Sequence, residues 1–327
     1  MTTVDTPVEP GRGRVRSAMP NGLYRGLLVA VTALFVALVV WYLVSIIVQA
    51  RPAFSTLGFS WIFAKVWNPE HGKFGLLPFI LGTLETTAIA MVLALPIGLG
   101  TALALSHLVP HRFRPPLSTT VELLAAVPSV VYGLWGLIVL APVFRSTVEP
   151  FLSSILGWTG LFNGPNDGVG VLLAGVILFV MVLPTMVAIS RDVLVVVPNE
   201  QVEGATALGA TRWQVLRKVV VPGARTGILG AFTLATGRAL GETVAVALVI
   251  GNSPFIAHSL KAPAATLASL IVNNFGEATG TELSALFGAG LVLLVIGIAV
   301  NATARVLVRS SARGGGGAAT AASVAVA

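Results

Sequence analysis

The sequence has no cysteine and few charged residues. The absence of cysteine from all 327 residues excludes disulfides, thiolate metal sites and a cysteine nucleophile. Asp, Glu, Lys and Arg make up 10% of the chain, whereas a soluble domain has about 25%. Hydrophobic residues supply 55% of the chain, and its mean hydropathy is +0.91. These values exclude a soluble protein and predict a polytopic membrane protein.

Motifs for nucleotide hydrolysis and for metal or serine chemistry are also missing. The only Gly-Lys pair, Gly72-Lys73, is followed by Phe74, so the sequence has no GxxxxGK[ST] loop for binding ATP phosphates. Neither GxSxG nor HExxH occurs. The histidines lie in predicted connecting segments without metal-ligand spacing: His71, His107, His111 and His258. We therefore expect neither an enzyme nor a cofactor-binding chain, and an intramembrane enzyme is the least favoured class.

Six apolar runs are each long enough to cross a bilayer, which takes about 20 helical residues. They are residues 27–48, 77–106, 117–141, 169–190, 226–251 and 283–308. The first run exceeds the apolar core of about 7 to 15 residues found in signal peptides. We therefore predict a retained helix there, although Val48-Gln49-Ala50 resembles a cleavage site. The predicted fold is all-α, with six transmembrane helices.

The remaining segments divide the chain around these spans. Residues 1–26 place arginines among Pro and Gly, a composition typical of a flexible arm. Residues 77–308 would form a core of five spans, with a further short helix within residues 264–275. The Gly- and Ala-rich residues 309–327 predict a flexible tail.

The distribution of Lys and Arg predicts the orientation of the chain in the membrane. One side collects 14 of them, in the N-terminal arm, the turn at 112–114, the segment 191–225 and the C-terminal end, and the other side has 5. Cytoplasmic loops carry the excess of basic residues, so both termini and residues 198–222 are expected in the cytoplasm. The net charge of +7 then belongs to the membrane surface and not to a nucleic-acid site.

A polar interval at residues 198–222 separates two of the apolar runs and predicts a pair of short helices. Asn199 is a good N-cap, and Glu200 and Glu203 place negative charge in the first turn, where the helix dipole favours it. Gly209 is expected to end this first helix.

A second helix is predicted directly after Gly209. Thr211 and Gln214 have the spacing of a capping box, and Pro222 is expected to end the helix. Apolar residues recur at helical spacing on each helix: Val202, Ala205 and Leu208 on the first, and Trp213, Leu216 and Val220 on the second. Such a helical hairpin offers a side for docking into the groove of a partner.

The spacing within this hairpin resembles the EAA loop of ABC-importer permeases. That loop reads Glu-Ala-Ala, three residues, Gly, nine residues, and then Ile-x-Leu-Pro. The chain has Glu203-Gly204-Ala205, Gly209 and Val219-Val220-Val221-Pro222 at the same spacing, and Gly204 replaces the usual Ala. The resemblance implies coupling to an ATPase through this segment, with Glu203, Gly204, Ala205, Gly209, Trp213 and Pro222 as the coupling residues.

Four ionisable residues lie inside the predicted spans: Glu85, Glu122, Arg238 and Glu242. Such residues cost about 2.5–3.5 kcal/mol at a helix centre on insertion scales, and they are usually functional. Arg238 and Glu242 stand at i and i+4 on one predicted helical face, beside a GxxxG step at Gly237 and Gly241. Either the two charges neutralise each other and fasten two helices, or Arg238 contacts an anion in a translocation path.

The other two carboxylates have less defined roles. Glu122 lies near the cytoplasmic end of its predicted span, where its carboxylate can reach water, which favours a structural role. Glu85 is followed by Thr86 and Thr87, and it either lines the translocation path or bonds a neighbouring helix.

Three stretches resemble one family of importer permeases more closely. They are TGRALGET, which contains Arg238 and Glu242, ELLAAVPSVVYGLWGL from Glu122 to Leu137, and SRDVL from Ser190 to Leu194. They are similar to the PstC-type permeases of bacterial phosphate importers, over roughly residues 57–310. The resemblance implies a type I, MetI-like permease core and favours Arg238 and Glu242 as substrate-path residues. Glu85 is a further candidate for the path because of its position within a span.

The same resemblance implies the partners and the mechanism. The partners would be a PstA-type permease, a dimer of PstB-type ATPases that binds ATP and Mg²⁺, and a PstS-type phosphate-binding protein outside the membrane. Transport would follow alternating access in the cytoplasmic membrane of a bacterium. A permease for sulfate or molybdate and a scaffold for phosphate sensing remain as alternatives. The sequence leaves open the affinity, the ATP stoichiometry, the resting conformation and the protonation of Glu242.

Overall fold

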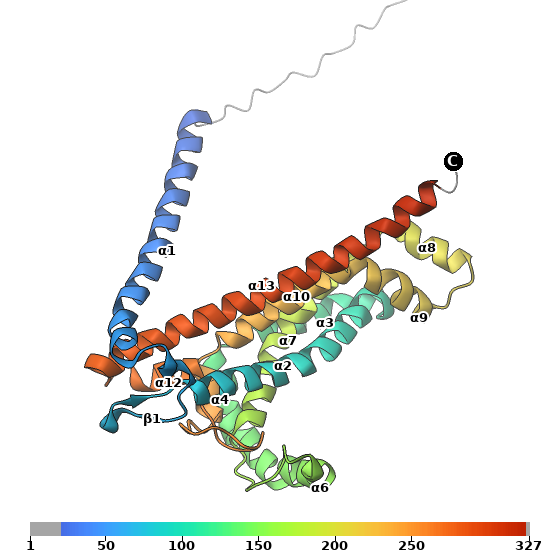
Figure 1. Ribbon diagram of the computed structural model, residues 1–327. Helices are drawn as coiled ribbons and strands as arrows, with labels where there is room; N and C mark the ends of the chain where they lie inside the picture. The colour runs from blue at the N-terminus through green and yellow to red at the C-terminus, as the bar shows by residue number, and fades with distance from the viewer. Residues whose placement is uncertain (1–20, 325–327) are drawn as a thin grey trace, which may run out of the picture. The chain divides into compact units, whose positions relative to one another are not determined.

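The computed structural model describes residues 21–324 of the chain (Figure 1). They belong to two compact units, one ending at Val48 and one beginning at Gln49. Residues 21–48 form helix, the first part of α1 (Asn21–Leu57). Residues 1–20 of the predicted arm lie outside the described residues, whereas residues 21–26 are helical and not a flexible arm. Polar residues form helical backbone hydrogen bonds as apolar ones do, and residues 21–26 contain no proline to interrupt the helix.

The second unit contains all the other helices and one small hairpin. Strands β1 (Trp67–Asn68) and β2 (Lys73–Phe74) pair antiparallel, with Trp67 opposite Phe74. The helices are α2 (Leu77–Leu103), α3 (Arg114–Ala126), α4 (Ser129–Trp135), α5 (Ala141–Val143), α6 (Glu149–Leu156), α7 (Val171–Val195), α8 (Asn199–Ala207), α9 (Arg212–Val215), α10 (Val221–Leu240), α11 (Val244–Val249), α12 (Leu267–Asn274) and α13 (Gly280–Val324). The short helix expected within residues 264–275 is α12.

Six helical segments of the described residues are long and apolar enough to cross a membrane, which confirms the predicted number of spans. They are Tyr24–Leu57, Leu77–Leu108, Ser129–Thr159, Val171–Val195, Arg212–Leu240 and Gly280–Thr303. The fold is therefore an all-helical polytopic one.

The third span lies further along the chain than predicted. Residues 117–141 do not form one helix, because α3 ends at Ala126 and α4 begins at Ser129. The backbone of Val127 is extended, with φ −67° and ψ 128°. The ring of Pro128 crowds the residue before it out of the helical region, so the helix must stop there.

Prolines account for two further differences from the sequence prediction. Pro142, Pro150 and Pro222 each occupy the second position of a helix that follows a π-helical stretch, namely Gly136–Leu140, Phe144–Val148 and Leu216–Val220. Proline has no backbone N–H to donate, and its ring clashes with the carbonyl four residues earlier in an α-helix. A wider, π-helical turn ahead of the proline gives the ring room and needs no hydrogen bond from it. The chain is consequently helical where residues 142–168 were expected to be a loop, as far as Thr159, and Pro222 does not end the helix before it.

The last helix, α13, continues beyond residue 308, where the last predicted span ends. Residues 309–324 belong to α13 and not to a flexible tail. No proline follows Pro263, and alanine, the best helix former, is frequent after residue 317.

Helix α7 is the centre of the second unit. It packs along α2 and α10 (Figure 1), and most of its residues on that side are buried, including Ile177, Met186 and Leu194. Close approach of α2 and α7 depends on small residues. A Cβ built on Gly175 of α7 would lie 2.6 Å from Cγ2 of Ile89 on α2. The contact leaves no room for a larger side chain.

We predict that Gly175→Ala destabilises the protein by about 1–3 kcal/mol, because the added methyl group overpacks the contact with Ile89. The matched control is Gly100→Ala on α2, where a Cβ would meet nothing within 4 Å. Thermal unfolding of the purified protein in detergent measures both changes. Equal melting temperatures for Gly175→Ala and Gly100→Ala would contradict the packing argument.

Candidate functional site

The helical path of the chain is broken just before the third span and just after the fifth, and segments next to these two breaks pack together. α3 and α4 are separated at Val127-Pro128, and α10 and α11 are separated at residues 241–243. α4 packs against α11, where a Cβ on Gly133 would lie 2.8 Å from Cα of Ala245. Non-helical backbone at membrane depth is tolerated where it is buried in protein or lines a path for a solute. This pair of breaks is therefore the first candidate for the translocation site.

At each break, a side-chain hydroxyl donates a hydrogen bond to a nearby backbone carbonyl. The Tyr132 hydroxyl donates to the carbonyl of Leu124 at 2.7 Å and so joins α4 back to α3. At the second break, the Thr243 hydroxyl donates to the carbonyl of Gly241 at 3.2 Å. Each unpaired backbone group would cost several kcal/mol in lipid, so these bonds stabilise the interruptions.

Arg238 lies in the last turn of α10, next to the second break. Its Nη1 donates to Oγ1 of Thr185 on α7 at 3.1 Å, and the residue is exposed. A guanidinium has several N–H donors in a rigid plane, and this single bond to a neutral hydroxyl leaves the others available. The hydroxyl of Thr185 therefore orients a cation that keeps donors for a further acceptor.

Glu242 does not form the expected pair with Arg238. Because α10 ends at Leu240, Glu242 is not on a helical face shared with Arg238, and its Oε1 accepts instead from the N–H of Ala245 at 3.4 Å. The ion pairs within residues 21–324 all involve Arg191. The prediction that Arg238 and Glu242 share one helical face is wrong because the helix ends at Leu240, before Glu242, and the alternative in which the two charges neutralise each other finds no ion pair in its support.

Glu85 lies on α2 and is half-buried between threonines. The Thr86 hydroxyl donates to the carbonyl of Gly82 at 2.8 Å, and the Thr87 hydroxyl is buried without a hydrogen-bond partner in the described part of the chain. No hydrogen bond or ion pair joins Glu85 to Arg238 or Glu242 among these residues.

The predicted helical hairpin is present. α8 runs from Asn199 to Ala207, and Gly209 follows with φ +84°, a conformation that favours glycine. Thr211 and Gln214 form the predicted capping box, with bonds of 2.9 and 3.4 Å between each side chain and the other residue's N–H. Asn199 is the first residue of α8 and not its N-cap, which is Pro198.

One side of the hairpin packs on the bundle and the other stays exposed. Val215, Leu216 and Val220 are buried in the core cluster around α2 and α7, and Val202 and Ala205 pack against them. By contrast, Leu208 is 91% exposed and Trp213 is 64% exposed. Trp213 does not share a side with Leu216 and Val220 as predicted, because the π-helical stretch Leu216–Val220 departs from α-helical periodicity. Leu208 and Trp213 are thus the exposed large apolar side chains of the hairpin.

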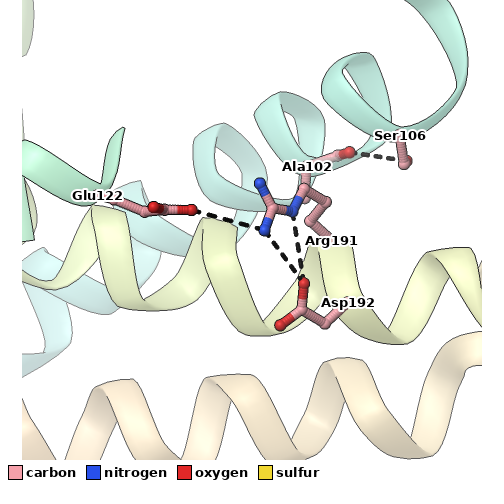
Figure 2. A network of polar contacts seen from close by, with 5 residues as sticks. All are labelled: Ala102, Ser106, Glu122, Arg191 and Asp192. Carbon is pink, nitrogen blue, oxygen red and sulfur yellow. Dashed lines mark hydrogen bonds and ion pairs between the residues drawn. The ribbon is translucent and has the colours of Figure 1, made fainter. Parts of the chain in front are cut away.

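A network of charges joins α3 and α7 (Figure 2). Arg191 on α7 lies 3.8 Å from Glu122 on α3 and 3.3 Å from Asp192. The three side chains are partly or largely exposed, so each pair contributes at most about 1 kcal/mol. The structure therefore gives Glu122 a partner that the sequence did not indicate, in a weak link between α3 and α7.

Two buried charges were missed by the sequence reading. Lys261 is 2% exposed, and its Nζ donates to Ser153 Oγ, the carbonyl of Gly164 and Asn166 Oδ1, each at 2.9 Å. Glu149 is 1% exposed and accepts from the N–H of Gly168 at 3.2 Å. Both residues fall in segments predicted as loops, where charge normally signals exposure. For Glu149, the apolar spacing of residues 144–156 could have indicated a helix, but Pro150 within that stretch argued against one.

Metal chemistry has no candidate here. Within residues 21–324, no three His, Asp or Glu side chains gather in a way that could hold a metal ion.

Comparison with known proteins identifies the family. Residues 94–313 match the family described as "Binding-protein-dependent transport system inner membrane component". The "Phosphate transport system permease protein PstC" of Mesorhizobium japonicum is 43% identical over 306 residues, which cover 92% of this chain and 94% of that protein. The "Probable phosphate transport system permease protein PstC" of Methanocaldococcus jannaschii is 38% identical over 283 residues, 84% of this chain and 90% of that protein.

Solved structures share the fold at lower identity. A bacterial ABC transporter that imports the acidic polysaccharide alginate has a chain with a TM-score of 0.59 and 16% identity, covering 89% of this chain and 99% of that one. A chain of the MetNI methionine ABC transporter in an inward-facing conformation has a TM-score of 0.54 and 19% identity, covering 72% of this chain and 95% of that one. On these grounds the chain is a multi-pass inner membrane protein that belongs to the family of binding-protein-dependent transport permeases and, within it, to the PstC permeases.

Proposed function

We propose that this chain is a permease subunit of an ABC importer that moves inorganic phosphate across the bacterial cytoplasmic membrane. The observation that carries the proposal is Arg238, a cation beside the break that follows the fifth span, hydrogen-bonded to Thr185 and with further guanidinium donors available. A planar guanidinium matches the geometry of an oxyanion and binds it through paired hydrogen bonds. The names of relatives that are 43% and 38% identical to the chain support phosphate as that oxyanion.

In this mechanism, phosphate passes the break before the third span and the break after the fifth. The cation of Arg238 attracts phosphate. The carboxylate of Glu242, which lies in the break at residues 241–243, repels phosphate and so speeds its release from Arg238. Glu85 would line the same path from α2 when a second permease of the PstA type completes the membrane assembly. A PstS-type protein would deliver phosphate from outside.

ATP hydrolysis would belong to a partner and not to this permease chain. We propose that the exposed Leu208 and Trp213 of the hairpin enter a groove of a PstB-type ATPase, with Glu203, Gly204 and Ala205 on the adjoining helix α8. The continuous helix from Arg212 to Leu240 would then carry ATPase motion toward Arg238. This arrangement requires the hairpin and both termini to lie in the cytoplasm, as the distribution of Lys and Arg indicates.

The orientation can be tested directly because the natural chain has no cysteine. We predict that Thr159→Cys, an exposed position between α6 and α7, reacts with a membrane-impermeant maleimide added to intact spheroplasts. Gln201→Cys, exposed on α8, should react only after the membrane is opened. The reverse pattern of labelling would invert the proposed topology.

Coupling can be tested with two glycines of the same hairpin. We predict that Gly209→Ala weakens ATPase stimulation and costs about 1 kcal/mol, because Gly209 has a φ of +84° that alanine adopts only with strain. Gly204→Ala is the matched control: it restores the residue usual in EAA loops at a helical site where a Cβ would meet nothing within 4 Å. It should preserve coupling and favour α8 by about 0.5–1 kcal/mol. ATPase activity of the reconstituted complex with binding protein measures both. Undiminished stimulation in Gly209→Ala would count against the hairpin as the coupling element.

Replacement of Arg238 should separate the substrate-contact role from a structural one. We predict that Arg238→Gln abolishes phosphate uptake, and that Arg238→Lys retains only a small part of it, because an ammonium lacks the planar donor pair. Thr185→Val should lower uptake less, since it removes the orienting hydroxyl but keeps the charge. The double change Arg238→Gln/Glu242→Gln should not restore uptake, because the two residues form no ion pair. Uptake into vesicles, normalised to assembled complex, is the measurement, and recovery in the double variant would make Arg238 structural.

A further inference from the structure

A cavity of about 610 Å³ lies at the end of the second unit that carries the small hairpin. Three separate segments form its walls: the β1–β2 hairpin, the loop after α11, and α12. The aromatic rings of Trp67 and Phe79 pack edge-to-face at 5.6 Å and are both largely buried, so they form an apolar base. We call it the asparagine cavity, after the residues Asn68, Asn252, Asn273 and Asn274 in its wall.

In two of these asparagines, the side-chain amide is held in place by a hydrogen bond that its nitrogen donates. The amide oxygen takes no part in that bond and can accept another. Asn252 donates from Nδ2 to the carbonyl of Ala247 at 2.7 Å, and Asn274 donates from Nδ2 to the carbonyl of Leu270 at 2.8 Å. These bonds use a donor of each amide and none of the carbonyl acceptors. Asn252 is also the non-glycine residue with positive φ, +50°, in the described chain, a conformation that asparagine tolerates better than most residues. Its position on the wall is thus set by the backbone.

The charge of the cavity is negative. The Glu70 carboxylate lies in the wall, and no Lys or Arg from residues 21–324 does. In the hairpin, Lys73 pairs with Asn68 across the strands but lines a different cavity. The imidazole of His71 lies 3.1 Å from Oδ1 of Asn68 and is not among the residues that line the cavity. Amide oxygens and a carboxylate over aromatic rings suit an ammonium or guanidinium group and repel an oxyanion. The cavity is therefore not a second site for the transported anion.

The wall of the cavity is tied to the bundle. The N–H of Leu267, at the start of α12, donates to Oγ1 of Thr83 on α2 at 3.0 Å. The residue before Thr83 on α2, Gly82, lies against the carbonyl of Ala265, so closely that a Cβ there would collide with it. A group that enters the cavity and presses on α12 consequently bears on α2, the helix that carries Glu85.

We propose that the asparagine cavity receives a lysine or arginine side chain of the external phosphate-binding protein and is part of its docking surface. The proposal rests on the proposed function, because the topology given there puts this end of the bundle outside. The binding protein is the favoured occupant for two reasons: the cavity's charge is complementary to a basic side chain, and its wall is connected to α2.

Two substitutions of opposite charge at the exposed Asn273 test whether the cavity receives a basic side chain. The probe is the organism's own PstS-type protein, purified with phosphate bound, and the receptor is the complete importer in nanodiscs of phosphatidylglycerol and phosphatidylcholine. We expect Asn273→Lys to weaken docking by about tenfold, because a fixed cation repels the incoming one, and Asn273→Asp to tighten it severalfold at low salt. The same two changes at Asn163, exposed on another segment of the same side and outside the cavity, should leave the dissociation constant unchanged.

The outcomes separate this inference from the proposed function. If the unaltered importer neither binds the PstS-type protein nor shows ATPase stimulation by it, the proposed function fails. If the unaltered importer docks and both Asn273 variants dock equally well, the inference about the cavity is overturned and the function stands. The inference is also overturned if Asn273→Lys only reduces co-purification of ethanolamine lipids with docking unchanged, because the occupant would then be a lipid amine.

Discussion

The requirement that backbone N–H and C=O groups be paired inside a membrane governs this structure. An uninterrupted helix meets the requirement by itself, and most spans of the chain do so. The chain breaks before the third span, at residues 127–128, and after the fifth span, at residues 241–243. At each break a side chain pairs with a released carbonyl: Tyr132 with that of Leu124 and Thr243 with that of Gly241. The breaks are thus stabilised features of the fold, and Arg238 lies beside one of them.

The sequence was sufficient for features that depend on composition and short spacing. Hydropathy gave the number of spans because the length of a span is set by the bilayer and not by tertiary packing. The capping box was found because Thr211 and Gln214, which form it, are only three residues apart in the sequence. The hairpin at residues 198–222 and its resemblance to the EAA loop were recognised for the same reason.

Features that depend on turns of unusual width or on distant contacts could not be read from the sequence. Proline signals the end of a helix, yet Pro150 and Pro222 are accommodated by π-helical stretches, whose formation depends on packing. The i, i+4 pair of Arg238 and Glu242 presupposed a helix that Gly241 ends. The partners of Arg238, Glu122 and Lys261 lie on other helices or loops, and a single sequence does not show which helices are neighbours.

The π-helical stretch before Pro222 has a mechanical meaning. It joins the second helix of the hairpin to α10 without a flexible hinge, so that residues Arg212–Leu240 form one rod of 29 residues. At a rise of 1.5 Å per residue, this rod is about 40 Å long, and a tilt of about 5° at its hairpin end would displace the far end by about 3–4 Å. Arg238 rides near that far end. A small rotation imposed at the membrane surface is thereby amplified into a shift comparable to the length of a hydrogen bond, enough to exchange one set of acceptors for another.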